Sequence, residues 1–289
     1  MSETRLIRTR LGTVEVTYLP GNKPAVLFFP GGHCSAASDC GWNLYTSESH
    51  GVMAFSRPGY GRTAVGHLNA VEFVPAVAEC CEELGMEQTA GAVGVSFGGM
   101  QALHLARALP ELVPRLILHS CAASTRAYPD TRPKALFGPL VFSPALQGLV
   151  WRAVAGMADS DAGLRLMVGS LSKRPVKEWW DTWSGEDKRQ ARELFRTMRS
   201  GSGFVNDLRQ ARPDRANYRR LIQTQTTCPT LVTASRQDAG VSFAHAEHYA
   251  HTIPGAYLVE LAAPSHLFWL GPTQTEAQSA VTAFMGSNP

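Results

Sequence analysis

No run of apolar residues in the sequence is long enough to span a lipid bilayer, so we expect no insertion into a membrane. The first ten residues also lack the apolar core of a signal peptide, and we therefore expect a cytoplasmic protein. An excess of charge is missing too, because 27 Lys and Arg against 24 Asp and Glu leave a net charge of +3. This balance, and the lack of a Gly-rich phosphate loop or an RNA-binding motif, argue against a nucleic acid partner. A small-molecule substrate is the expected partner, and the sequence is compatible with a homo-oligomer.

Cysteines and histidines are present but lack the spacing of metal ligands. The six cysteines form no paired motif, and Cys80 and Cys81 are adjacent, so we expect reduced and mostly buried thiols. His245, His248 and His251 follow one another at intervals of three, which makes successive side chains drift around a helix. Because no acidic ligands accompany them, we expect these histidines on a solvated helix face. The sequence thus predicts no metal site.

Short apolar runs alternate with helical patterns along much of the 289 residues. A hairpin is expected at the N-terminal end, with strands at 4–9 and 14–18. Further strands are expected at 25–29, at 51–56, before Ser96, at 116–120, at 230–234 and at 256–261, with helices at 70–84, after Ser96, at 243–251 and at 273–285. This alternation predicts an α/β fold with a mostly parallel central sheet and helices on both faces.

The alternation stops for about a hundred residues in the middle of the chain. Between residues 123 and 225 the sequence has helical segments with Pro, Trp and many Arg, but no convincing buried strand. We therefore predict two parts: a core formed by residues 1–122 and 226–289, and a helical cap formed by residues 123–225.

A candidate nucleophile lies where an apolar run turns at once into a helical pattern. The segment Gly94-Val95-Ser96-Phe97-Gly98 fits the pattern G-x-S-x-G. Glycines two residues before and two after the serine remove the Cβ atoms that would collide in such a turn. The hydroxyl of Ser96 would then lie at an exposed point of the sheet, beside the positive end of a helix. That geometry suits a nucleophile.

The chain resembles serine-nucleophile members of the α/β-hydrolase superfamily that carry a helical cap. The features that match are the Gly94–Gly98 motif, the loop from Arg57 to Arg62, and an Asp followed by a His late in the chain. The resemblance implies that Asp238, after the strand at 230–234, is the acid, although an Asp there also suits a plain turn. It implies that His266, between the last strand and the last helix, is the base. We assign a structural role to the loop from Arg57 to Arg62.

The same resemblance assigns the oxyanion donors. The N–H of Phe97 is one expected donor, and Gly32 supplies the second, with His33 as the next choice. This loop has Pro30-Gly31 where the family usually has a His-Gly pair. We predict that the substrate contacts His33, Cys34, Cys121, Trp179, Trp183 and Phe268. For Cys34 the alternative is simple packing under the loop, and for the two tryptophans it is anchoring of the cap to the core.

These residues predict a cofactor-independent serine hydrolase that cleaves a carboxylic ester or a lactone through an acyl-enzyme on Ser96. Four alternatives use the same three residues: an aminopeptidase similar to proline iminopeptidases, a C–C bond hydrolase, an acyltransferase and a perhydrolase. Proline iminopeptidases usually have Trp where this chain has Phe97, which disfavours the first. A ligand-binding protein without activity is a further alternative, disfavoured because all three residues are present.

Overall fold

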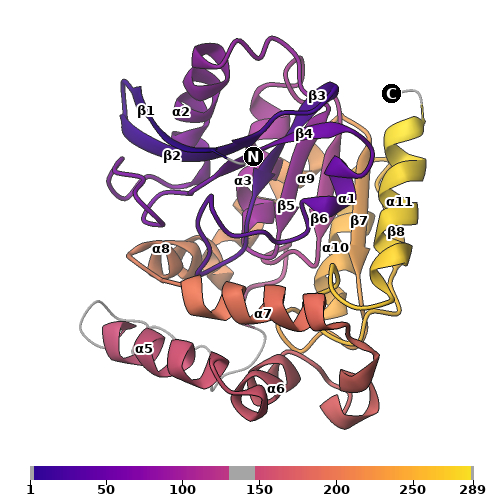
Figure 1. Cartoon of the computed structure of the whole chain (residues 1–289). Coiled ribbons are helices and arrows are strands. Elements are labelled where there is room, and N and C mark those ends of the chain that lie inside the picture. The colour runs from indigo at the N-terminus through magenta and orange to yellow at the C-terminus, as the bar shows by residue number, and fades with distance from the viewer. Residues whose placement is uncertain (1–2, 130–146, 288–289) are drawn as a thin grey trace.

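The computed structural model describes residues 3–129 and 147–287, and its centre is an eight-stranded sheet. The strands lie in the order β1-β2-β4-β3-β5-β6-β7-β8 (Figure 1). Their bounds are β1 Glu3–Thr9, β2 Gly12–Leu19, β3 Lys23–Phe29, β4 His50–Phe55, β5 Gly91–Val95, β6 Leu116–His119, β7 Thr230–Ala234 and β8 Tyr257–Glu260.

The sheet is mostly parallel, as predicted. β1 and β2 form an antiparallel hairpin closed at Gly12, and β2 also pairs antiparallel with β4. All pairs from β4 to β8 are parallel. The carboxyl ends of these parallel strands therefore meet at one end of the sheet, where the loops after them can come together.

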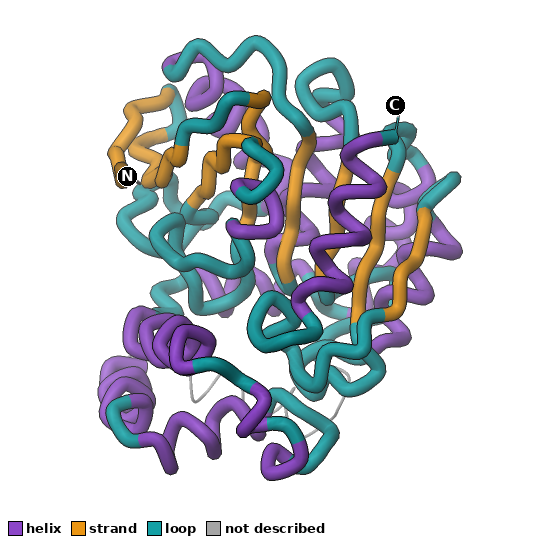
Figure 2. Tube along the Cα trace, turned by 45° about the vertical axis from the view of Figure 1, so that its right-hand side comes forward, coloured by secondary structure: helices purple, strands orange, loops and turns teal. Residues whose placement is uncertain are grey.

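Side chains of the central strands alternate between two apolar cores, one on each face of the sheet. In β3, Val26 and Phe28 belong to one core, while Leu27 and Phe29 belong to the other. Helices cover both faces, which confirms the predicted α/β architecture (Figures 1 and 2). The first core receives α1 Asn43–Thr46 and α11 Gln274–Gly286; the second receives α2 Ala70–Glu83, α3 Gly98–Ala108, α9 Ala216–Thr224 and α10 Phe243–Thr252. The sequence did not predict α1, because one helical turn is too short to produce a periodic pattern.

Helices α5 to α8 lie across the end of the sheet that carries the loops after the parallel strands (Figure 1). Their bounds are α5 Gln147–Ala158, α6 Asp161–Ser170, α7 Gly185–Thr197 and α8 Gly203–Gln210, with single 3₁₀ turns at Val176–Glu178, Trp180–Thr182 and Pro213–Arg215. We call these four helices and the segments that link them, residues 147–210, the cap. The next helix, α9, packs against α3 and α10 beside the sheet. Within 3–129 and 147–287, no helix is long and apolar enough to cross a membrane.

The packing of α3 on the sheet explains one glycine directly. A Cβ atom at Gly94 would lie 2.5 Å from the Cα of Gly99, where neither backbone can move independently. We therefore expect Gly94→Ala to lower the free energy of unfolding by about 2 kcal/mol or more, because overpacking displaces the backbone. Urea unfolding followed by circular dichroism measures this change.

Gly156→Ala is the matched control, since Gly156 lies exposed inside α5 and a Cβ there meets nothing within 4 Å. This control should raise stability by about 0.5–1 kcal/mol, because alanine favours the helix. Equal effects of the two substitutions would show that the contact between β5 and α3 is not tight.

Candidate active site

Ser96 occupies a strained turn between β5 and α3. Its φ angle is +53°, a left-handed conformation that costs free energy for any residue other than glycine. A Cβ atom at Gly98 would overlap the carbonyl oxygen of Phe29, and one at Gly94 would collide with the start of α3. Both glycines of the motif are therefore required by backbone contact. The turn presents Ser96 at the carboxyl end of a central strand, as the sequence predicted.

His266 and Asp238 meet at the carboxyl ends of β7 and β8. The Nδ1 atom of His266 lies 2.7 Å from Oδ2 of Asp238, and the Asp238 side chain is buried. The other oxygen, Oδ1, accepts hydrogen bonds from the backbone N–H groups of Gly240 at 2.7 Å and Val241 at 2.9 Å. The carboxylate is thus held from both sides and orients the imidazole ring.

The carboxylate also changes the acidity of the imidazole. Burial disfavours the charged ring, but the negative charge of Asp238 and its hydrogen bond outweigh burial and raise the pKa of His266 above 6.5. A neutral His266 then has Nδ1–H directed at Asp238, which leaves Nε2 with a lone pair. A ring in that state can accept a proton from a hydroxyl group.

A cavity of about 600 Å³ lies at this end of the sheet. Ser96 and His266 both line it, although they come from loops 170 residues apart in the chain. Gly32 and Phe97, the two expected oxyanion donors, line the same cavity. A Cβ at Gly31 would lie 3.1 Å from the Cβ of Ser96, so the backbone before Gly32 passes directly over the serine.

The cap forms an apolar wall of this cavity. The side chains come from all four cap helices and from the chain that links them: Trp151, Val154, Met167, Leu171, Leu194, Phe195, Met198 and Phe204. From the core, the predicted pocket residues His33 and Cys34 line the cavity, together with Trp269.

The other four predicted substrate contacts do not line this cavity. Trp179 and Trp183 are buried in the core cluster that also contains Trp269 and Leu270, which agrees with the alternative that they anchor the cap. A Cβ at Gly271 would collide with the indole of Trp183, so the cap packs closely on the loop after His266. Aromatic composition alone could not distinguish a pocket wall from this interface.

Cys121 and Phe268 are likewise held in the protein interior. The Sγ atom of Cys121 lies 3.2 Å from the carbonyl oxygen of Gly94 and contacts Gly99, so it fills the space beneath α3. Phe268 is fully buried, and the centroid of its ring lies 4.8 Å from the centroid of the His119 ring. Its neighbour Trp269 reaches the cavity instead, because successive side chains of this loop point in different directions.

The histidine series on α10 also differs from expectation. His245 is fully buried, and its Nδ1 atom lies 3.0 Å from Oγ of Ser124. The Nδ1 atom of His248 lies 2.6 Å from Oγ1 of Thr125. The predicted solvated face is therefore wrong for His245 and only partly right for the half-buried His248, because the segment after β6 covers this part of the helix, whereas His251 is exposed as predicted. Among the residues that the structure describes, no cluster of His, Cys, Asp or Glu could hold a metal ion.

A short segment of the cap supports the Asp238 and His266 loops, which the sequence did not reveal. The carbonyl oxygen of Leu171, just after α6, accepts N–H bonds from His266 at 3.0 Å and from Ala239 at 3.1 Å. The N–H of Lys173 donates to the carbonyl oxygen of Gln237 at 2.8 Å. The cap therefore fixes the backbone on both sides of the Asp238–His266 pair. Sequence patterns cannot detect such backbone contacts because they do not depend on side-chain type.

A buried ion pair links the cap to residues 30–34, the loop after β3 that we call the oxyanion loop for its expected role, and sequence analysis did not predict this pair. Arg57 binds Asp207 of α8 through two hydrogen bonds, of 2.5 and 2.9 Å. Its Nε and Nη2 atoms also donate to the carbonyl oxygens of Pro30 and Gly31, both at 3.2 Å. The hydroxyl of Tyr60 donates to the same carboxylate at 2.6 Å. The loop from Arg57 to Arg62 thus has a structural role, as predicted, and that role includes positioning the backbone next to Gly32.

His33 is neutral in this environment. Burial lowers its pKa to about 3, and the nearby guanidinium of Arg57 acts in the same direction. Its Nδ1 atom lies 2.9 Å from Oγ of Ser200, which also accepts a hydrogen bond from Nε1 of Trp151 at 2.9 Å. The ring therefore forms an uncharged part of the cavity wall beneath the cap.

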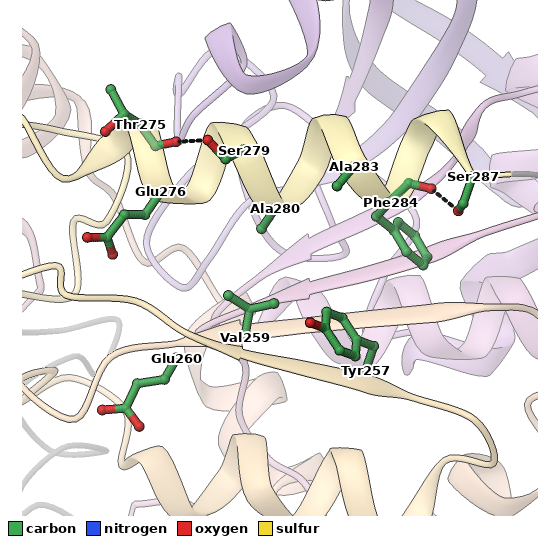
Figure 3. Close-up of a pocket in the computed structure, with 10 residues that line it drawn as sticks. All are labelled: Tyr257, Val259, Glu260, Thr275, Glu276, Ser279, Ala280, Ala283, Phe284 and Ser287. Atoms are coloured by element: carbon green, nitrogen blue, oxygen red, sulfur yellow. Dashed lines mark hydrogen bonds between the residues drawn. The ribbon is translucent and has the colours of Figure 1, made fainter.

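A second hollow, of about 650 Å³, lies between β8 and α11 at the edge of the sheet (Figure 3). Tyr257 and Phe284 face each other across it, and its serines bond within their own helix. Its acidic residues have partners, since Glu260 binds Arg236 and Glu276 accepts the N–H of Ala262. No histidine is among its lining residues. The cavity with Ser96 is therefore the candidate active site.

Comparison with known proteins agrees with this architecture. A sequence model of the alpha/beta hydrolase fold matches residues 24–272. The chain therefore belongs to the alpha/beta hydrolase fold family. A Bacillus subtilis (strain 168) protein, the uncharacterized hydrolase YcgS, is 28% identical over 284 residues, which are 96% of each chain.

Several solved structures share the fold at low sequence identity. An alpha/beta hydrolase fold protein from Nakamurella multipartita has a TM-score of 0.75 and 20% identity, covering 99% of this chain and 100% of the other. A thermophilic esterase from Thermogutta terrifontis has a TM-score of 0.69 and 19% identity, covering 98% of both chains. The enol-lactonase from Burkholderia xenovorans LB400 has a TM-score of 0.69 and 16% identity, covering 98% and 100%.

The buried ion pair between cap and core predicts a large loss of stability when one partner loses its charge. Asp207→Asn would leave the Arg57 guanidinium buried without its counter-charge. We expect it to lower the free energy of unfolding by about 3 kcal/mol or more. Asp214→Asn is the control, because Asp214 forms an exposed pair with Arg212 and should cost about 0.5 kcal/mol or less. Urea unfolding of both variants measures the difference, and similar values would contradict a structural role for the Arg57–Asp207 pair.

Proposed function

We propose that this hydrolase cleaves carboxylic esters or lactones through an acyl-enzyme formed on Ser96. The observation that carries the proposal is the Asp238–His266 hydrogen bond of 2.7 Å, whose imidazole lines the same cavity as Ser96. The names of an esterase and a lactonase among the structural relatives support the same reaction class.

The proposed chemistry follows from the properties of each group. A serine hydroxyl is a weak nucleophile at neutral pH, so His266 accepts its proton as the oxygen attacks the carbonyl carbon. Asp238 holds the ring in the required tautomer and stabilises the imidazolium ion. His266 then donates the proton to the leaving alcohol, and water cleaves the acyl-enzyme by the reverse sequence. No cofactor takes part in these steps.

The oxyanion that forms on the carbonyl carbon requires hydrogen-bond donors. Phe97 is the N-cap residue of α3, so its N–H lies at the end of the helix where backbone donors have no acceptor within the helix. Gly32 contributes the second N–H, on a loop that Arg57 holds through the carbonyl oxygens of Pro30 and Gly31. We propose that these two donors bind the oxyanion.

The cavity wall indicates the kind of substrate. Cap residues such as Trp151, Met167 and Phe204 present apolar surface, and the neutral His33 adds no charge. Esters or lactones with an apolar acyl group therefore fit better than charged ones, because a charge would lose its hydration without gaining a partner.

Labelling with a fluorophosphonate probe tests the proposed nucleophile. Ser96 should form a covalent adduct in the folded protein, detected by mass spectrometry of the intact chain and its peptides. Ser96→Ala should abolish labelling and lower kcat for p-nitrophenyl esters at least about ten-thousandfold. Ser170→Ala is the matched control, since Ser170 lines the same cavity and should not be needed for labelling. Labelling elsewhere, or unchanged hydrolysis by Ser96→Ala, would overturn the assignment.

The pH dependence tests the role of Asp238. Because the reaction needs neutral His266, kcat/KM should rise with pH through the pKa of His266, which the carboxylate raises above 6.5. Asp238→Asn removes that charge, so the acidic limb of the profile should move to lower pH. The same substitution should lower kcat by about ten-thousandfold, because the ring loses its fixed tautomer. An unshifted profile with nearly normal kcat would show that Asp238 is not the partner of the base.

A further inference from the structure

Two thiols face each other in the wall of the catalytic cavity, and the proposed hydrolysis uses neither. Sγ of Cys40 donates a hydrogen bond to Sγ of Cys34 across 4.0 Å. Both residues are buried from bulk solvent, yet both line the cavity that contains Ser96. A reagent small enough to enter the cavity therefore reaches this pair.

The position of the pair connects it to the oxyanion loop. Cys34 follows His33 directly and lies two residues after Gly32. His33 has a φ angle of +68°, so the backbone at this point is already in an unfavourable conformation. A disulfide requires the sulfur atoms to approach from 4.0 Å to about 2.0 Å, so its formation draws Cys34 and Cys40 together and pulls on the loop that Cys34 shares with Gly32.

We propose that Cys34 and Cys40 form a reversible disulfide when a small hydroperoxide enters the cavity, and that this disulfide lowers turnover by displacing the loop that carries Gly32. The disulfide itself does not depend on the proposed function, whereas its effect on turnover does.

The two cysteines have unequal reactivity, which gives the order of the steps. The hydrogen bond from Cys40 lowers the pKa of the Cys34 thiol, and Arg57 contributes in the same direction against the effect of burial. The same contact and burial raise the pKa of Cys40. Cys34 is therefore the thiol that ionises first and reacts with peroxide.

The reaction balances with peroxide as the oxidant. The Cys34 thiolate attacks one oxygen of hydrogen peroxide, an S–O bond forms, the O–O bond breaks, and hydroxide takes up a proton as water. The sulfur of Cys40 loses its proton and attacks the sulfenic sulfur of Cys34. The S–S bond forms as the S–O bond breaks, and a second water leaves. Two thiols are oxidised to one disulfide and one peroxide is reduced to two waters; a dithiol reductant reverses the change.

The experiment treats the full-length protein with hydrogen peroxide, blocks remaining thiols, and maps the peptides without reduction. We expect a peptide pair joined through Cys34 and Cys40, and a fall in kcat of about tenfold or more for a p-nitrophenyl ester. Dithiothreitol should remove the cross-link and return kcat to its starting value. Each variant is compared with its own untreated activity, because both cysteines line the cavity.

Three variants separate the pair from the other thiols. Cys34→Ser and Cys40→Ser should form no such cross-link, and peroxide should not produce a loss of activity that dithiothreitol reverses. Cys80→Ser is the control: Cys80 is buried in α2 in the other core, so this variant should respond as the wild type does.

The possible results lead to distinct conclusions. Oxidation of Cys34 to sulfinic acid without a cross-link would overturn the disulfide, and so would a cross-link to any other cysteine. A cross-link with unchanged kcat would overturn its effect on turnover. If untreated protein hydrolyses no ester or lactone, the proposed function fails, while the peptide map still decides whether the disulfide forms.

Discussion

The chemistry of this site depends on one contact, the hydrogen bond between Nδ1 of His266 and Oδ2 of Asp238. It joins loops after two neighbouring parallel strands, and parallel pairing places both loops at the end of the sheet where β5 delivers Ser96. Without the carboxylate, burial alone would lower the pKa of the imidazole and leave its orientation unspecified. The fold therefore contributes more than proximity, because it sets both the tautomer and the acidity of His266, the proposed base.

The cap is part of this arrangement and does more than line the cavity. It supports the Asp238 and His266 loops through the backbone of Leu171 and Lys173, and it reaches the oxyanion loop through Asp207 and Arg57. Burying two charges costs free energy, and removing one partner of the buried pair also costs free energy because it leaves the other charge without a counter-charge. The cap is thereby fixed to the groups proposed to act on the substrate, and changes in its helices are expected to alter their geometry.

Much of the fold, and the places of Ser96, Asp238 and His266 within it, followed from the sequence, because the patterns that predict them are local. The G-x-S-x-G pattern reflects backbone contacts at Gly94 and Gly98 that leave no room for a Cβ atom. The strand at Thr230–Ala234 was predicted at its observed bounds. Features that depend on tertiary packing could not be predicted from the sequence. Trp179, Trp183 and Cys121 were assigned to the pocket by composition, yet their neighbours bury them. The Arg57–Asp207 pair spans 150 residues and leaves no local pattern.

A crystal structure of the protein after reaction with an organophosphonate tests this arrangement most directly. We expect phosphorus bonded to Oγ of Ser96, its oxygen within hydrogen-bond distance of the N–H groups of Gly32 and Phe97, and Nε2 of His266 facing the bonded serine oxygen. An adduct on another side chain, or an imidazole of His266 that lies beyond reach of the adduct, would contradict it.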